Sequence, residues 1–415
     1  MRPRPPETAP DAGPLVRAGH LPPRRAFGNV DRASSISPIH SAIRLDRRDL
    51  SGSPERMTIR LENVSVVSMG QSIISDVSLA VERGTMNVLL GPSLAGKTTL
   101  LRLLAGLDTP TSGRILVNDE DVTGKPVRQR SVAMVYQQFM NYPSLSVYEN
   151  IASPLRVANV RNDEIERRVQ AVARLLGLQS MLDRLPHQLS GGQQQRTAIA
   201  RAIVKGAELV LLDEPLANLD YKLREELREE LPSILKQSGA ILVYATAEPL
   251  EALLLGGVTA TLAKGRMVQC GPTAEVYAHP NHIESARVFS DPPLNEIDAE
   301  KQDGSLRLAG DLTVPAVGVA ARLADGAYTL AFRGDMVTLG TPWPASVSLP
   351  GKVTVAEISG SETFVHVATA LGTFVCVERG VSMRLPDQPV TLHVDAARMF
   401  VFDRAGQPVV ARLAS

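Results

Sequence analysis

Three short segments of the chain carry residue types that bind and cleave phosphate groups. They are GPSLAGKTT at 91–99, LSGGQQQR at 189–196 and LVLLDEP at 209–215. Glycines let backbone N–H groups close around an anion, while lysine and hydroxyl side chains reach phosphate and Mg²⁺. Carboxylates that follow an apolar run suit Mg²⁺ binding and proton abstraction. Together the three segments predict a site for the phosphates of a nucleotide.

The first segment assigns phosphate contacts residue by residue. Lys97 is expected to reach the β- and γ-phosphates, and Thr98 to bind Mg²⁺ through its hydroxyl. The helix that follows presents its positive N-terminal end to the same anion. The predicted nucleotide-binding residues of this segment are Gly91, Pro92, Ser93, Leu94, Ala95, Gly96, Lys97, Thr98 and Thr99.

The other two segments add a second anion-binding turn and a metal ligand. The glycines at 191–192 open a further helix, whose N-terminus also favours an anion. Asp213 ends an apolar strand, where a carboxylate is costly unless it meets a cation or donors. We therefore expect Asp213 to bind Mg²⁺.

In this order the segments resemble the Walker A, signature and Walker B motifs of ATP-binding cassette (ABC) proteins. The resemblance implies ATP and Mg²⁺ as cofactors and ATP hydrolysis as the reaction. It makes Glu214 the catalytic residue that polarises the attacking water. It makes Gln137 a Q-loop residue that acts in catalysis, senses Mg²⁺ and touches the membrane subunit. The signature residues implied to close over the ATP of an opposite subunit are Ser190, Gly191, Gly192 and Gln193.

Two departures from the ABC pattern concern the same site. Most ABC importers place a histidine in a Thr-His-Asp turn after the last sheet strand, but here the turn reads Thr246, Ala247, Glu248. Alanine has no donor for transition-state charge, and losing one such contact costs about 10²–10³ in rate. No aromatic residue occurs between Phe27 and Tyr136, so Met69 is expected to replace the usual platform for adenine.

Longer strings narrow the resemblance to the ATP-binding subunits of carbohydrate and polyol importers, most closely the glycerol importer. They are MVYQQFMNYPSLSVYENIASPLRV at 134–157, PLANLDYKLREELREELP at 215–232 and YATAEPLEALLLGG at 244–257. The resemblance covers about 57–405. It implies two transmembrane permease subunits, an indirectly linked substrate-binding protein, and a location on the cytoplasmic face of the inner membrane. The segment 137–151 would receive the coupling helix of the permease.

The glycerol-importer relative also lacks the histidine and pairs with a different ATPase chain, which implies a heterodimer here, with a homodimer as the alternative. Two further alternatives stay open at this point. In the first, the chain would be a largely non-hydrolysing partner that binds ATP and completes the other subunit's site. In the second, the importer would carry another sugar or glycerol phosphate.

Alternating short strands and helices from 57 to 290 predict an α/β fold with a parallel sheet, since β-branched runs recur between helical segments. This region is the predicted ABC nucleotide-binding domain, with a helical subdomain at about 145–195. Residues 291–349 are predicted to form a linker and the first part of a regulatory domain. Residues 350–407 are predicted to form its OB-like (TOBE-type) β-barrel.

Composition limits the partners. The 44 Lys and Arg residues balance the 44 Asp and Glu residues, so the chain lacks the positive field that nucleic-acid binding normally uses. The two cysteines show no metal-ligand spacing, as expected of a reduced compartment. No apolar run reaches the length that spans a bilayer. We therefore predict a peripheral protein that binds no nucleic acid.

The first 56 residues contain ten Arg, nine Pro and no Lys. They show no sustained apolar period, which predicts an extension without folded structure. Met57 opens a well-patterned strand, expected at a sheet edge. The alternative therefore stays open that the natural start codon encodes Met57 and that the first 56 residues lie upstream of the translated protein.

Overall fold

A six-stranded sheet, parallel except for one edge strand, forms the centre of the cassette in this computed structural model. The structure describes residues 58–138, 140–217, 219, 221–237, 239–308 and 312–409. The predictions for residues 1–56 and for a start at Met57 lie outside these ranges. The strand order is β10-β9-β3-β8-β7-β6, and β10 alone is antiparallel to its neighbour. The strands are β3 (Met86–Leu90), β6 (Val132–Val135), β7 (Leu209–Asp213), β8 (Ile241–Thr246), β9 (Val258–Ala263) and β10 (Arg266–Pro272).

The sequence of the central strands explains their position. Every residue of β7 and β8 is buried, which fits strands covered on both faces. One apolar cluster lies on the helical side and contains Ile151, Ile199 and Leu212, while a second contains Leu101, Leu211 and Val243. Leu211 and Leu212 face opposite clusters because successive side chains of a strand alternate between faces.

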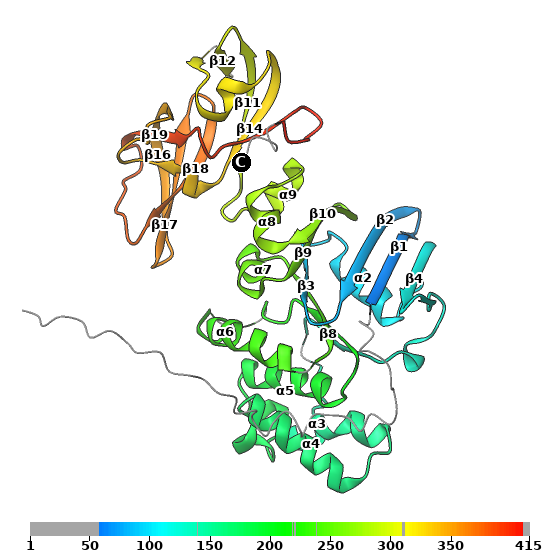
Figure 1. Ribbon diagram of the computed structural model, residues 1–415. Coiled ribbons are helices and arrows are strands. Elements are labelled where there is room, and N and C mark those ends of the chain that lie inside the picture. Colours follow the sequence, from blue (N-terminus) through cyan, green and yellow to red (C-terminus); the bar gives the residue numbers. More distant parts are fainter. Residues whose placement is uncertain are drawn as a thin grey trace, which may run out of the picture. The chain divides into compact units, whose positions relative to one another are not determined.

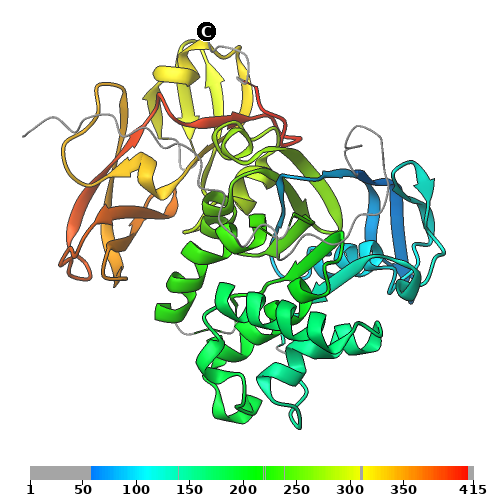
Figure 2. The ribbon, with the colours of Figure 1, turned by 60° about the horizontal axis from the view of Figure 1, so that its bottom comes forward.

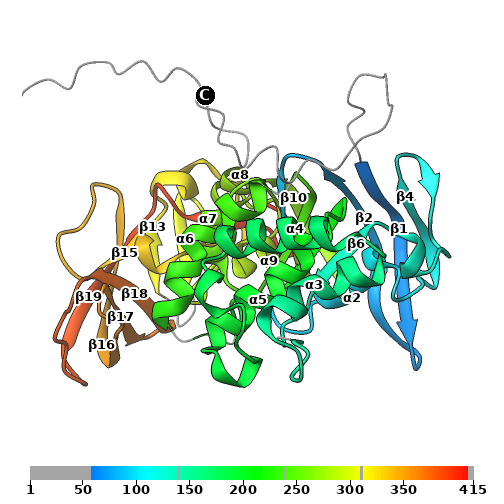
Figure 3. The same ribbon diagram turned by 90° about the horizontal axis from the view of Figure 1, so that it is seen from below.

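A second, antiparallel sheet has the order β2-β1-β4-β5, and Figure 3 labels its strands β2, β1 and β4. Its strands are β1 (Thr58–Ser68), β2 (Gln71–Glu82), β4 (Ser112–Val117) and β5 (Glu120–Asp121). β1 pairs with both β2 and β4. The expectation of an edge strand after Met57 is therefore wrong, because alternating apolar residues reveal a half-buried strand but not its number of partners.

Some helices pack on the parallel sheet, and those that lie between β6 and β7 in the sequence form a separate group (Figure 1). They are α2 (Lys97–Ala105), α3 (Val147–Val157), α4 (Asn162–Leu175), α5 (Gly191–Val204), α6 (Tyr221–Gln237), α7 (Pro249–Leu255), α8 (Thr273–Ala278) and α9 (Ile283–Val288). The helices α3, α4 and α5 contact one another. The predicted helical segment therefore contains helices, whereas the domain boundaries at 290/291 and 349/350 stay predictions.

Two antiparallel five-stranded sheets form the tail, as the expected OB-like β-barrel domain (Figure 2). The first sheet contains β11 (Asn295–Gln302), β12 (Ser305–Leu308), β13 (Thr313–Pro315), β14 (Gly326–Phe332) and β20 (Phe400–Phe402). The second contains β15 (Val337–Thr338), β16 (Ser346–Ile358), β17 (Glu362–Thr369), β18 (Gly372–Arg379) and β19 (Pro389–Asp395). Both contribute to one core, which includes Phe332, Phe374 and Val401.

No helix within the described ranges is long and apolar enough to cross a membrane.

Candidate nucleotide-binding site

The loop between β3 and α2 places the predicted phosphate-binding backbone. Gly96 caps α2 with a φ of 101°, a conformation that favours glycine. A Cβ on Gly91 would lie 2.4 Å from the backbone oxygen of Leu262, so no larger residue fits there. Lys97 Nζ donates to the backbone oxygens of Gly91 at 2.7 Å and Pro92 at 3.0 Å. The loop is therefore closed by its own lysine.

Thr98 and Asp213, two of the residues predicted to bind Mg²⁺, are in contact, and their role as metal ligands stays a prediction. The Thr98 hydroxyl donates to Asp213 Oδ1 at 3.1 Å, and Asp213 is only 5% exposed. Burial raises the pKa of Asp213, while the Thr98 hydrogen bond and the nearby Lys97 oppose that effect. A buried carboxylate with a raised pKa is stabilised by a cation, so this pair suits a hard metal ion.

Glu214 follows directly and joins Lys97 to Gln137. Lys97 Nζ lies 3.0 Å from Glu214 Oε1, and Gln137 Nε2 donates to Glu214 Oε2 at 3.3 Å. Lys97 is 4% exposed, so the ion pair is largely shielded from water. The structure thus gathers Lys97, Thr98, Gln137, Asp213 and Glu214 at the edge of the sheet where β3, β6 and β7 end.

The donor set fits Mg²⁺ bound together with a nucleotide. In the part of the chain that the structure describes, no group of three or more His, Cys, Asp or Glu side chains is placed to hold a metal. Mg²⁺ commonly takes one or two carboxylates and completes its shell with phosphate oxygens and water. Asp213, Thr98 and Gln137 provide one carboxylate, one hydroxyl and one amide, which fits that kind of site.

The signature segment forms the start of α5. Ser190 Oγ accepts from the Gln193 backbone N–H at 3.4 Å, and Gln193 Oε1 accepts from the Ser190 backbone N–H at 3.1 Å. This reciprocal pair is a capping box, which satisfies two donors at the helix start. Gly191 and Gly192 occupy the first helical turn. Their action on the ATP of an opposite subunit stays a prediction.

The turn after β8 keeps its shape without a histidine. Thr246 Oγ1 accepts from the Glu248 backbone N–H at 3.0 Å and donates to Glu251 Oε2 at 2.6 Å. Pro249 begins α7, where its missing N–H is not needed. Ala247 is exposed and carries only a methyl group.

A cavity of about 510 Å³ lies beside Ala247. It is lined by Pro92, Ala247, Glu248, Pro249, Ala263, Lys264, Glu284, Arg287, Val288, Ser290 and Asp291. The cavity therefore joins the phosphate loop to the turn that lacks the histidine. Met69, the expected adenine platform, is fully exposed in the turn between β1 and β2, and its role stays a prediction.

Sequence reasoning missed two polar groups that support this turn. Glu251 is 4% exposed and also accepts from the Tyr244 hydroxyl at 3.1 Å. Glu248 forms ion pairs with Arg224 at 2.6 Å and with Arg228 at 2.9 Å. The spacing of the two arginines places them on one face of α6, because residues four apart are neighbours on a helix. That spacing was the available signal, but it does not identify the partner.

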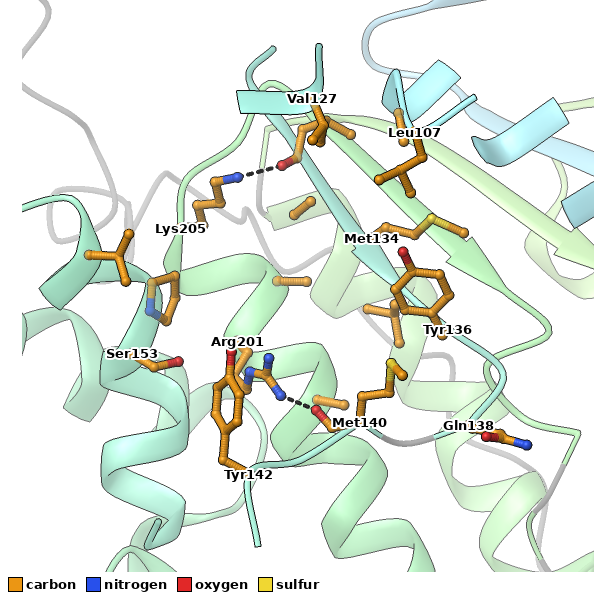
Figure 4. A pocket seen from close by; sticks show the side chains of 18 residues that line it. Leu107, Val127, Met134, Tyr136, Gln138, Met140, Tyr142, Ser153, Arg201 and Lys205 are labelled. Carbon is orange, nitrogen blue, oxygen red and sulfur yellow. Dashed lines mark hydrogen bonds between the residues drawn. The ribbon is translucent and has the colours of Figure 1, made fainter. Parts of the chain in front are cut away.

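An apolar groove of about 410 Å³ borders the predicted Q-loop (Figure 4). Apolar lining side chains include Leu107, Val127 and Met134, and Arg201 lies over the Tyr142 ring at 4.5 Å. Gln138, Met140 and Tyr142 contribute from the segment 137–151. The groove thus combines an apolar floor with a cationic side chain. Phe139 lies outside the described residues.

Comparisons with known proteins agree with this geometry. Residues 74–217 match the family model described as ABC transporter, and residues 330–402 match the TOBE domain. The trehalose/maltose import ATP-binding protein MalK of Thermococcus litoralis is 35% identical over 362 residues, which cover 83% of this chain and 97% of that protein. The sn-glycerol-3-phosphate import ATP-binding protein UgpC of Rhizobium meliloti is 36% identical over 354 residues, covering 84% and 99%.

A solved structure supports the cassette fold. The chain of cbiO1 from Clostridium perfringens, described as part of the ABC transporter complex cbiONQ, aligns with a TM-score of 0.51 and 27% identity. The alignment covers 54% of this chain and 92% of that one. With its Walker-type residues in mutual contact and its tail matching the TOBE domain, the chain belongs to the ABC transporter ATPases, in the group of import ATP-binding proteins.

Proposed function

We propose that this ATPase powers the import of a small polyol or sugar, with glycerol as the substrate. The observation that carries the ATP-driven part of the proposal is the contact of Glu214 with Lys97 and Gln137 beside the Thr98–Asp213 pair. Two relatives named as import proteins for trehalose/maltose and for sn-glycerol-3-phosphate support the substrate class. The names differ in substrate, so glycerol rests on the resemblance of the strings at 134–157, 215–232 and 244–257.

The residues of this chain have separate tasks in hydrolysis. Bound ATP would supply the phosphoryl group, and Mg²⁺ would neutralise the charge on its oxygens. Lys97 and the N–H groups of 91–96 would hold the phosphates, and Thr98, Asp213 and Gln137 would hold the metal. Glu214 would accept the proton of the attacking water, because it is a carboxylate beside the phosphate-binding lysine.

We assign the groove near Arg201 to the coupling helix of a permease. A helix with an apolar face fits a groove lined by Leu107, Val127 and Met134. Two permease subunits would place the ATPase on the cytoplasmic face of the membrane, with a substrate-binding protein acting on the permeases. The substrate itself would not touch this chain.

The exposed methyl of Ala247 favours a heterodimer with a second ATPase that keeps a histidine in this turn. In that assembly the capped N-terminus of α5 completes the partner's site through Ser190 and Gln193. The alternative is a chain that binds ATP but scarcely hydrolyses it, and the same observation favours this alternative. A homodimer is the third arrangement to be tested.

The deciding experiment measures ATPase turnover of the full chain and of Ala247→His, alone and mixed with the candidate second ATPase. Turnover near zero for the wild type alone, a gain for Ala247→His, and high turnover for the mixture support the heterodimer. Ordinary turnover of the wild type alone, unchanged by the substitution, would show that another group supports the γ-phosphate.

Uptake of labelled glycerol and of labelled glycerol phosphate tests the substrate in cells that express the transporter. Loss of glycerol uptake alone in a Lys97→Ala strain supports glycerol, whereas loss of glycerol phosphate uptake alone supports the alternative. An Arg161→Ala strain serves as the control, since Arg161 is exposed and distant in sequence from every predicted site residue.

A further inference from the structure

The backbone at Glu214 is held in an unfavourable conformation. Its φ is 43°, which residues with a Cβ rarely adopt and which persists only where the surroundings fix it. The Glu214 N–H donates to the Ala245 oxygen at 2.9 Å, and the Glu214 oxygen accepts from the Ala217 N–H at 3.2 Å. The direction of the Glu214 carboxylate therefore depends on two turns, 214–217 and 245–248.

Arg224 of α6 contacts both turns. Its Nη2 donates to the backbone oxygens of Ala217 and Leu219, each at 3.4 Å. Its Nη1 donates to Glu248 Oε1 at 2.6 Å. One planar guanidinium thus links the segment after the Walker B strand to the turn after β8. Its rigid fork suits two directed contacts of this kind.

Glu248 is in turn anchored at its other oxygen and at its backbone. Arg228 Nη2 donates to Glu248 Oε2 at 2.9 Å, and Arg228 is buried. The Glu248 N–H donates to Thr246 Oγ1 at 3.0 Å. Since Thr246 follows Ala245, the contacts form a closed circuit that begins and ends at Glu214.

We infer that Arg224 and Glu248 are positioning residues for ATP hydrolysis, because they hold the two turns that fix Glu214. Within the described part of the chain, the hydrogen bonds and ion pairs of these two side chains do not reach Lys97, Thr98 or Asp213. The pair therefore acts on the geometry of Glu214 rather than on phosphate binding. The inference rests on the proposed role of Glu214 as proton acceptor. It also gives the turn at 246–248 a task that needs no histidine.

The test compares Arg224→Ala, Glu248→Ala and the double variant of the full chain in an assembly that hydrolyses ATP. Each single variant is expected to lower kcat by about 10- to 100-fold, the scale of a misplaced catalytic group. KM for ATP and the Kd of a fluorescent ATP analogue should change less than about twofold. The double variant should be no slower than either single variant, because both break one circuit.

A matched pair controls for the loss of an ion pair as such. Arg398 and Asp335 form an exposed pair at 2.8 Å in the tail, and Arg398→Ala and Asp335→Ala should leave kcat unchanged. Glu248→Gln keeps the shape of the side chain and guards against a folding defect in Glu248→Ala. Additive effects, or equal losses of kcat and ATP affinity, would overturn the inference.

Hydrogen exchange gives a readout that needs no turnover. The Glu214 and Ala217 amides should exchange faster in the Arg224 and Glu248 variants than in the wild type, and at the wild-type rate in the Arg398 control. Unchanged exchange would overturn the inference.

If Glu214→Gln leaves kcat intact, the proposed role of Glu214 fails. If Glu214→Gln abolishes turnover while the Arg224 and Glu248 variants do not reduce it, only the positioning role fails.

Discussion

At the residue scale, two acids are buried near the site for different reasons. Asp213 lies beside Thr98 and the Lys97 ammonium, so the cost of burying its carboxylate is partly offset at the predicted phosphate and metal site. Glu251 instead accepts from the hydroxyls of Thr246 and Tyr244. Burial raises the pKa of Glu251, and these two hydrogen bonds only partly oppose the rise.

Replacing Glu251 by glutamine should stabilise the chain at neutral pH. A raised carboxyl pKa means that the folded chain holds the proton more tightly than the unfolded chain. The free energy of unfolding therefore falls as the pH rises through the interval above the ordinary glutamate pKa of about 4.3. Glutamine does not titrate, so Glu251→Gln removes that decline. The variant's Tm should therefore exceed the wild-type Tm by an amount that increases from pH 4 to pH 7.

Thermal unfolding across that pH range checks the prediction. Glu229→Gln, at an exposed position of α6, controls for the change in total charge. A Tm difference that is the same at every pH would show that the Glu251 carboxyl titrates alike in the folded and unfolded chain.

At the scale of elements, serine caps begin two helices of the subdomain with different expected consequences. Ser146 Oγ accepts from the Glu149 N–H at the start of α3, and Ser190 caps α5 in the same way. Ser146→Ala and Ser190→Ala should each destabilise the chain by about 0.5–2 kcal/mol. Only Ser190→Ala should also weaken ATP-dependent dimerisation, since α5 is the helix assigned to the opposite nucleotide.

Chemical denaturation and light scattering with ATP test this pair of variants. Equal losses of dimerisation in both would attribute the effect to helix stability instead of to the signature turn. No loss in either would contradict the assignment of Ser190 to an opposite subunit.

The predictability of the elements depended on how local their signals are. The short runs at 86–90, 131–136, 208–213 and 240–246 predict strands of a parallel sheet, because apolar and β-branched residues favour buried strands. The structure has strands there, at Met86–Leu90, Val132–Val135, Leu209–Asp213 and Ile241–Thr246. Pairing partners are not written in such runs, which is why the position of β1 within its sheet was predicted wrongly. The contact of Arg224 with Glu248 joins residues 24 positions apart, so it follows from the fold and not from the local pattern.

At the scale of the whole chain, one buried arginine joins the cassette to the tail. The Arg333 guanidinium lies 3.8 Å from the Tyr277 ring centre and 4.9 Å from that of Phe400. Its Nη2 donates to the Tyr277 backbone oxygen at 2.7 Å. Arg333 is 6% exposed, and burial lowers its pKa. A planar cation between two rings suits this site better than an ammonium group.

Arg333→Lys should therefore destabilise the junction although it keeps the charge. The lost stacking is worth about 2 kcal/mol for a desolvated pair. We expect calorimetry to resolve a separate, lower transition for the tail. Arg398→Lys is the control, because Arg398 is about half exposed and pairs with Asp335. A single transition at the wild-type Tm in Arg333→Lys would contradict this role.

The contacts of Arg333 with Tyr277 and Phe400 limit how the tail can be exchanged between transporters. Tyr277 lies in α8, Arg333 follows β14 and Phe400 begins β20, so any crossover between 278 and 332 would pair the ring of one parent with the arginine of the other. A chimera that is to keep its junction must therefore be cut before Tyr277, or must carry all three side chains from the same parent.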